Sequence, residues 1–151
     1  MNDKVLNALS SAIYVSRVTL AGETVDTDDK RIRASGLYPE WKEGSYAVGD
    51  IYNAKGQTWE CFQAYDNATY PDINPDNSAW YTFNRPLHGT TPETARPFVP
   101  VQGSHDMYHT GEYMIWTDGK VYRCKNDTNF SPEDHADDWE EIAENAEVTA
   151  E

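Results

Sequence analysis

The side chains best suited to chemistry in this chain are aromatic rings that stand next to amide groups. Phe130 follows Asn126 and Asn129, and Tyr70 lies between Asn67 and Asn74. A ring of this kind can bury the patch of C–H groups on one face of a pyranose sugar, while nearby amides bind the sugar hydroxyls. In a chain with few aliphatic residues, the same rings could instead fill the core. Both interpretations stay open at this point.

Other reactive groups show no pattern of an enzyme or of a metal site. Cys61 and Cys124 occur in similar sequence contexts far apart in the chain, which favours two buried free thiols over a disulfide. Neither has a second cysteine or histidine at the spacing of a zinc site. The sequence contains no nucleophile motif and no glycine-rich phosphate loop. We therefore predict no catalytic residue, no metal, no cofactor and no enzymatic activity.

Composition limits the class of partner. The 151 residues are 38% hydrophobic and 13% aromatic, so a core must be built largely from aromatic rings. The formal net charge of −14 repels nucleic acid and anionic membranes, and we expect neither as a partner. There is no apolar run of roughly 18 residues, and no basic region followed by an apolar stretch begins the chain. The sequence therefore predicts neither a membrane span nor a secretion signal.

The first 36 residues contain one amphipathic pattern. Val5, Leu9 and Ile13 recur every four residues, which predicts a helix to about Ser16. Residues 13–20 are rich in β-branched side chains, and we expect the end of this run to become a strand, with helix as the alternative. A helix this short should pack its apolar stripe against something, and a partner chain is one option.

Turn-forming residues divide the rest of the chain. Residues 46–65 predict two strands joined through Asn53–Gly56, because both of those residues can adopt positive φ. Residues 66–78 predict an irregular loop. Residues 84–104 are rich in proline and predict a stiff linker. The acidic end of the chain predicts a frayed tail.

One segment of the chain recurs. Each copy contains a tyrosine and a glycine at the same spacing, and then a second glycine followed by an aromatic residue and a cysteine at the same spacing. The copies differ in length after the cysteine, where a loop tolerates insertions. The sequence therefore predicts a duplicated module. The matched pairs are Tyr46/Tyr108, Gly49/Gly111, Asp50/Glu112, Gly56/Gly119, Trp59/Tyr122, Cys61/Cys124, Pro75/Pro132 and Trp80/Trp139.

This order of residues resembles the small chitin-binding modules of carbohydrate-binding families 5 and 12. The phrase L-Y-P-E-W before G-x-Y-x-V-G-D looks like the form found in virion proteins of phages and prophages. The resemblance implies a mainly β fold with two small antiparallel β modules in tandem, preceded by a short N-terminal helix or extended anchoring segment. The expected divisions are an anchoring segment at 1–36, a first module at 37–84, a Pro-rich linker at 85–104, a second module at 105–143 and an acidic tail at 144–151.

In that family, sugar binding depends on an exposed aromatic residue two positions before the loop proline. The position is Ile73 in the first copy and Phe130 in the second, so the resemblance favours the second copy. Trp41, Trp80 and Trp139 match the tryptophans that support the core in the family. The expected carbohydrate-binding residues are Phe130, Asn126, Asn129, Tyr70, Tyr81 and Trp116.

The resemblance implies a non-enzymatic phage virion accessory protein, such as a head fibre, a capsid decoration or a tail component. Its expected partners are host-surface polysaccharide and other virion proteins bound through residues 1–36. The small aromatic modules and the apolar N-terminal stripe also predict a homo-oligomer. It would be made in the host cytoplasm and act on the virion. The alternative is a purely structural virion protein whose modules bind other proteins and no longer bind sugar.

Overall fold

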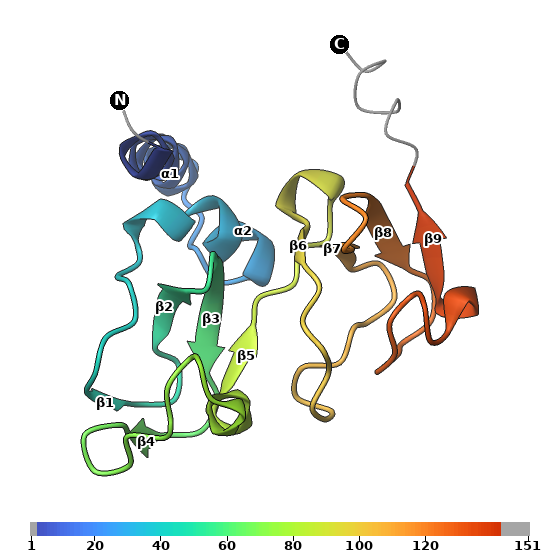
Figure 1. The fold of residues 1–151 in the computed structure, drawn as a ribbon. Helices are drawn as coiled ribbons and strands as arrows, with labels where there is room; N and C mark the ends of the chain where they lie inside the picture. The colour runs from blue at the N-terminus through green and yellow to red at the C-terminus, as the bar shows by residue number, and fades with distance from the viewer. Residues whose placement is uncertain (1–2, 143–151) are drawn as a thin grey trace. The chain divides into compact units, whose positions relative to one another are not determined.

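The structure is a computed structural model that describes residues 3–142. Over these residues the chain is mostly β, with several small antiparallel sheets and one long N-terminal helix (Figure 1). It divides into two units, of which the first ends at Leu87 and the second begins at His88. The mainly β fold class is confirmed. The predicted tail at 144–151 lies outside the described residues. No helix in the described range is long and apolar enough to cross a membrane.

The first element, α1 (Asp3–Leu20), is a single helix of 18 residues. We predicted a strand at its C-terminal end, and this prediction is wrong, since the helix continues to Leu20. Tertiary contacts override the weak helix propensity of the β-branched residues. The buried hydroxyl of Ser11 donates to the carbonyl of Arg33 (3.0 Å) and accepts from the amide of Gly36 (2.9 Å). A Cβ atom at Gly36 would lie 2.5 Å from the carbonyl oxygen of Asn7, so this close approach requires glycine.

The short helix α2 (Asp28–Arg33) is built into the first unit. The guanidinium of Arg85 lies 2.8 Å from the carboxylate of Asp28 and 2.8 Å from that of Glu60. These charges are largely shielded from water, so each needs its partner, and together they tie α2 to the sheet. Residues 28–36, which the sequence assigned to an anchoring segment, are therefore part of the first unit.

Two small antiparallel sheets complete the first unit. One pairs β1 (Ser45–Tyr46) with β4 (Tyr65–Asp66). The other has the strand order β2-β3-β5 and contains β2 (Ile51–Ala54), β3 (Gln57–Cys61) and β5 (Asn84–Pro86).

The hairpin between β2 and β3 is tighter than the sequence predicts. Its loop consists of Lys55 and Gly56, with φ of 53° and 76°. A two-residue loop follows the twist of its strands when both of its residues have positive φ. Asn53, expected to take positive φ, instead pairs with Thr58 inside the sheet.

Aromatic rings fill the first unit, as the composition predicts. Trp59 and Trp80 are almost completely buried and meet edge to face, with 4.6 Å between ring centroids. The hydroxyl of Tyr52 hydrogen-bonds to the hydroxyl of Tyr65 (2.9 Å) and to the side-chain carbonyl of Asn84. The side-chain polar groups of Tyr52, Tyr65 and Asn84 thus satisfy one another.

The second unit contains one sheet with the strand order β6-β7-β8-β9. Its strands are β6 (Arg96–Pro97), β7 (Tyr113–Ile115), β8 (Val121–Cys124) and β9 (Trp139–Glu141). β6 runs parallel to β7, and the other pairs are antiparallel. The core beneath the sheet consists of the buried side chains of Tyr108, Met114, Cys124 and Trp139.

The proline-rich stretch at 85–104 is not a linker. It contributes to β5 in the first unit, and then provides the 3-10 helix η3 (Pro92–Thr94) and β6 in the second. Pro92 stands at the start of η3, where no backbone N–H is needed, so proline is compatible with order there. The second unit therefore begins well before residue 105, the expected start of the second module.

Each unit contains the same backbone hydrogen bond at equivalent positions of the predicted repeat. The amide of Gly49 donates to the carbonyl of Cys61 (2.8 Å), and the amide of Gly111 donates to that of Cys124 (2.9 Å). Each cysteine thiol donates to the carbonyl two residues further on, at 3.1 Å and 3.0 Å. Both cysteines are buried free thiols, as predicted.

The predicted match between Trp80 and Trp139 is wrong in register. Cys124 pairs with Trp139 across β8 and β9, whereas Cys61 pairs with Asn84 across β3 and β5. Trp80 lies earlier, in the 3-10 helix η2 (Ser78–Thr82). Both tryptophans are nevertheless buried in their units, the role that the resemblance implies for them.

Candidate functional site

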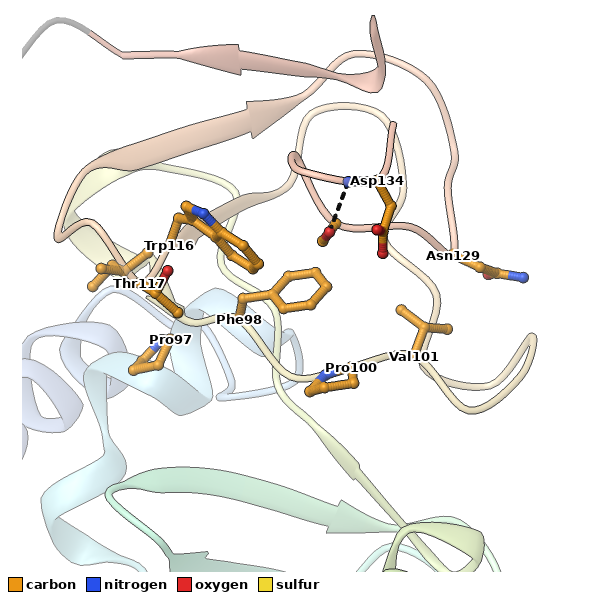
Figure 2. Close-up of a pocket in the computed structure, with 10 residues that line it drawn as sticks. Pro97, Phe98, Pro100, Val101, Trp116, Thr117, Asn129 and Asp134 are labelled. Carbon is orange, nitrogen blue, oxygen red and sulfur yellow. Dashed lines mark hydrogen bonds between the residues drawn. The ribbon is translucent and has the colours of Figure 1, made fainter. Parts of the chain in front are cut away.

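A groove of about 730 Å³ opens on the second unit (Figure 2). Its surface combines two aromatic rings and aliphatic groups with an amide, two hydroxyls and a carboxylate. A concave and mainly apolar surface with a few polar groups is the usual form of a small-molecule site. The lining residues are Pro97, Phe98, Pro100, Val101, Ile115, Trp116, Thr117, Asn129, Ser131 and Asp134.

Phe98 and Trp116 form the aromatic part of the groove (Figure 2). Their rings meet edge to face, with centroids 5.2 Å apart and an angle of 78° between the planes. Strand pairing positions both, because Phe98 follows β6 and donates its amide to the carbonyl of Ile115 (2.9 Å), at the end of β7. Phe98 also stacks on the buried ring of Tyr108, with centroids 5.3 Å apart. Both groove rings are half-buried, so they are fixed by the core and still accessible to a ligand.

Asn129, Ser131 and Asp134 bring polar groups to the groove from the loop between β8 and β9. The hydroxyl of Ser131 accepts a hydrogen bond from the amide of Asp134 (3.1 Å), drawn in Figure 2. The indole N–H of Trp139 donates to the carbonyl of Phe130 (3.0 Å) and ties the same loop to the core. These bonds fix the hydroxyl of Ser131 and the backbone of the loop, which reduces the entropy lost when a ligand binds.

Asp138 holds the base of this loop. Its carboxylate lies 2.8 Å from Nδ1 of His135 and accepts from the side-chain amide of Asn126 (3.4 Å). A hydrogen bond from Thr128 is the main cause that keeps the pKa of the Asp138 carboxyl below its ordinary value, and the charge of His135 adds to it. The loop is therefore built around an ionised carboxylate at neutral pH.

Trp116 also borders a second hollow of about 350 Å³. Tyr122 and Asp118 take part in its wall, and the Tyr122 hydroxyl donates to the Asp118 carboxylate (2.8 Å). This hydrogen bond raises the pKa of Tyr122 to about 12. Because one indole borders both hollows, an extended ligand can contact Trp116 from either of them.

The structure brings two of the predicted carbohydrate-binding residues, Trp116 and Asn129, into one groove. Phe130 is 55% exposed, but its ring stacks near His135, with centroids 5.8 Å apart, and does not line the groove. Asn126 is engaged with Asp138 and also lies outside the lining.

The other two predicted residues, Tyr70 and Tyr81, belong to the first unit. Tyr70 is 63% exposed and borders a hollow of about 380 Å³ together with Ile73. Tyr81 packs against Trp59 and Trp80, with centroids 5.6 Å and 5.8 Å away.

One wall of the groove was missed by the sequence reasoning. Residues 97–101 supply Pro97, Phe98, Pro100 and Val101, and all of them fall in the stretch interpreted as a linker. The apolar run F-V-P-V could have indicated them, because adjacent large apolar side chains are unusual in a solvated linker.

The described part of the chain shows no group of three or more His, Cys, Asp or Glu side chains that could hold a metal ion. No model of a protein family matches the chain, and no curated protein matches its sequence. The functional interpretation therefore depends on the groove itself and on the sequence pattern around it.

Proposed function

We propose that the protein is a non-enzymatic accessory protein of a phage virion, and that its second unit binds carbohydrate. The observation that carries the proposal is the groove, whose lining includes the rings of Phe98 and Trp116 together with Asn129 and Asp134. An aromatic ring buries the C–H face of a pyranose, and amide and carboxylate groups bind its hydroxyls.

The charge of the groove restricts the class of sugar. Its lining contains the carboxylate of Asp134 and no basic side chain. The whole chain carries a net charge of −14. A sulfated or phosphorylated polysaccharide would be repelled, so a neutral host-surface polysaccharide is the better ligand.

The virion setting rests on the resemblance of residues 37–83 to modules of phage and prophage particles. In this proposal residues 1–36 attach the protein to other virion proteins, as a head fibre, a capsid decoration or a tail component. A groove that binds one short glycan weakly gains avidity when many copies stand on one particle.

The first unit supports a second candidate function, a purely structural virion protein whose units bind other proteins. The position that stacks on sugar in the resembling family is Ile73, which is only 9% exposed. Tyr81 is packed on two tryptophans. Those features leave the first unit poorly suited to sugar, so sugar binding depends on the groove of the second.

A glycan array followed by NMR titration of the full chain tests the proposal. We expect a neutral oligosaccharide to shift the amide signals of Trp116 and Asn129. Trp116→Ala and Asn129→Ala should each weaken binding by about tenfold, the loss expected for one stacking or hydrogen-bonding group of moderate strength. Phe130→Ala is the matched control, because this ring is exposed outside the groove.

Two results would contradict the proposal. If the wild-type chain binds no glycan on the array, the structural alternative stands. If Phe130→Ala abolishes binding while Asn129→Ala does not, the sugar is bound by the exposed ring and the groove is the wrong site.

Attachment to particles is tested by a deletion that removes α1, with circular dichroism to verify that the shortened chain keeps its sheets, because α1 and residues 28–36 both belong to the first unit. The shortened chain should fail to join particles. Full occupancy on particles would show that attachment does not use this segment.

A further inference from the structure

The helix α1 has two unlike faces. Ser11 is fully buried and Val18 is 7% exposed, and both lie on the face that packs on the first unit. Leu6, Leu9 and Ile13 are 48%, 51% and 47% exposed. Burying such side chains is favourable in water, so the exposed face is a candidate for a partner.

The exposed residues follow a seven-residue repeat. Leu6, Ile13 and Leu20 are spaced by seven, and Leu9 and Ser16 stand three residues after the first two of them. These are the a and d positions of a heptad, the pattern with which one helix packs on another. We call these five residues the heptad seam. Ser11 and Val18 take the f position, on the side opposite to the seam, so packing on the first unit leaves the seam accessible.

A heptad seam is complementary to a copy of itself. The distribution of charge along the chain also favours a second copy as the partner. The chain has a net charge of −14, yet α1 contains one acidic residue, Asp3, and two basic ones, Lys4 and Arg17. None of them lies on the seam. Two copies of this acidic chain therefore repel least when they meet through α1.

The helix is also ordered before it meets a partner. A free helix of this length is marginal in water, and the cost of forming it would oppose pairing. Here the hydrogen bonds of Ser11 to Arg33 and Gly36 fix α1 against the first unit. The contacts of the seam can therefore stabilise the pair directly.

We propose that the heptad seam joins α1 to the α1 helix of a second copy of this chain, parallel and in register. The parallel register places each seam residue against its own counterpart, so Leu20, which is 89% exposed in the single chain, also gains a partner. An antiparallel pair would place Leu6 against Ser16 and leave Leu20 beyond the seam. It would gain only exposed ion pairs between Asp3 and Arg17, which contribute less than a buried leucine.

This inference goes beyond the proposed function, because it concerns how copies assemble whatever the groove binds. In a parallel pair, attachment to a particle would involve the paired form of the N-terminal segment. The pair would also carry two grooves, which raises avidity for a repeating polysaccharide.

Sedimentation of the full chain over a wide concentration range tests the pairing. We expect the wild type to associate, and we expect added salt to strengthen the association because it screens repulsion between the acidic chains. Ile13→Glu should weaken it at least about tenfold, since it places a carboxylate in the seam. Asn7→Glu is the matched control: it adds the same charge at an exposed position of α1 outside the seam. Circular dichroism verifies that both variants keep their helix.

Cross-linking tests the orientation. Ser16→Cys should form a disulfide with its counterpart in another copy under oxidising conditions. The wild type is the control, because Cys61 and Cys124 are buried. Cross-linking only in a mixture of Ser16→Cys with Leu6→Cys would show an antiparallel pair and overturn the proposal.

Three further results would overturn the proposal. The first is a wild type that stays monomeric at every concentration, and the second is equal weakening by Asn7→Glu and Ile13→Glu. The third is a monomer whose binding to particles is lost in Ile13→Glu. That outcome would assign the seam to another virion protein. Loss of glycan binding in any of these variants would concern the groove and leave the pairing result unchanged.

Discussion

The two units use the same backbone hydrogen bonds around Cys61 and Cys124, but they fill the space beneath the sheet differently. In the first unit, Tyr52 hydrogen-bonds to Tyr65 and Asn84 in the interior. The position of Tyr52 in the hairpin is occupied by Met114 in the second unit, where the core is an apolar and aromatic cluster. The buried hydrogen bonds that Tyr52 makes in the first core thus have no counterpart at Met114 in the second.

The two units also differ in how far their aromatic rings are covered. In the first unit η2 and the N-terminal helices supply further covering groups, and Trp59 and Trp80 are almost completely buried. In the second unit β6 leaves Phe98 and Trp116 half-buried at the surface. The same hairpin frame therefore covers a core in the first unit and borders an aromatic groove in the second.

The largest expected effect is the difference in stability lost when the matched residues Trp59 and Tyr122 are each replaced by alanine. Trp59→Ala should lower the free energy of unfolding of the first unit by about 3–5 kcal/mol, because it leaves a cavity where a 1% exposed ring stood. Tyr122→Ala should cost the second unit less than about 2 kcal/mol, since its half-exposed ring has less area to lose. Denaturant unfolding followed by NMR signals from each unit measures both values. Equal losses would show that the two positions are packed alike.

The second-largest expected difference is in how much an ion pair stabilises each unit. Arg85→Ala should destabilise the first unit by about 1–3 kcal/mol, because it strips Asp28 and Glu60 of a partner in a largely shielded site. Lys120→Ala, which breaks the exposed contact with Glu141 (3.3 Å), should cost at most about 1 kcal/mol. The same denaturation experiment compares them. A neutral Arg85→Ala would mean that other contacts, such as the ion pair of Arg31 with Glu60 (3.7 Å), hold α2 without Arg85.

A conservative pair of changes tests the two kinds of core. Tyr52→Phe should cost the first unit about 1–2 kcal/mol, because Asn84 loses the hydroxyl that it binds. Met114→Leu should cost the second unit less than about 1.5 kcal/mol, because the volume is nearly conserved and no hydrogen bond is lost. Thermal unfolding monitored by NMR reports each unit. A larger loss in Met114→Leu than in Tyr52→Phe would reverse the comparison.

Low pH should destabilise both units, and this is the smallest of the expected effects. Hydrogen bonds, chiefly from Thr128 in one case and Thr69 in the other, lower the pKa of Asp138 and of Asp66 in the folded chain. Their contribution to stability is present above the ordinary aspartate value of 3.8 and is lost as the pH falls through the lowered value. Asp138→Asn should reduce this acid loss in the second unit only, and Asp66→Asn in the first unit only. Thermal unfolding from pH 7 to pH 2 measures it. Loss of acid sensitivity in the wrong unit would contradict the assignment.

The sequence predicted the parts of the fold that depend on local spacing. The glycines and cysteines of the repeat lie where the hairpins need them, because turn geometry and strand pairing are set within a few residues. The match of Trp80 with Trp139 failed, because strand register depends on contacts with Asn84 that no spacing reveals. The prediction for the C-terminal end of α1 was wrong for a similar reason, because the tertiary contact between Ser11 and Gly36 fixes the helix.

The groove could be predicted only in part. Trp116 and Asn129 were predicted as sugar-binding residues because a ring and an amide suit a sugar, and both line the groove. Phe98 was missed because proline density was given more weight than the apolar run around it. β6 pairs in parallel with a strand well separated in the sequence, and no local pattern announces such a pairing.

The parallel strand β6 has a consequence for how such a site can change. One wall of the groove comes from residues 97–101, before the hairpin of β7 and β8, and the opposite rim comes from the loop after it. Neither segment contains the glycines and cysteine that define the hairpin. Substitutions in the two segments can therefore accumulate by drift, or be grafted in the laboratory, to give new ligand preferences on an unaltered scaffold.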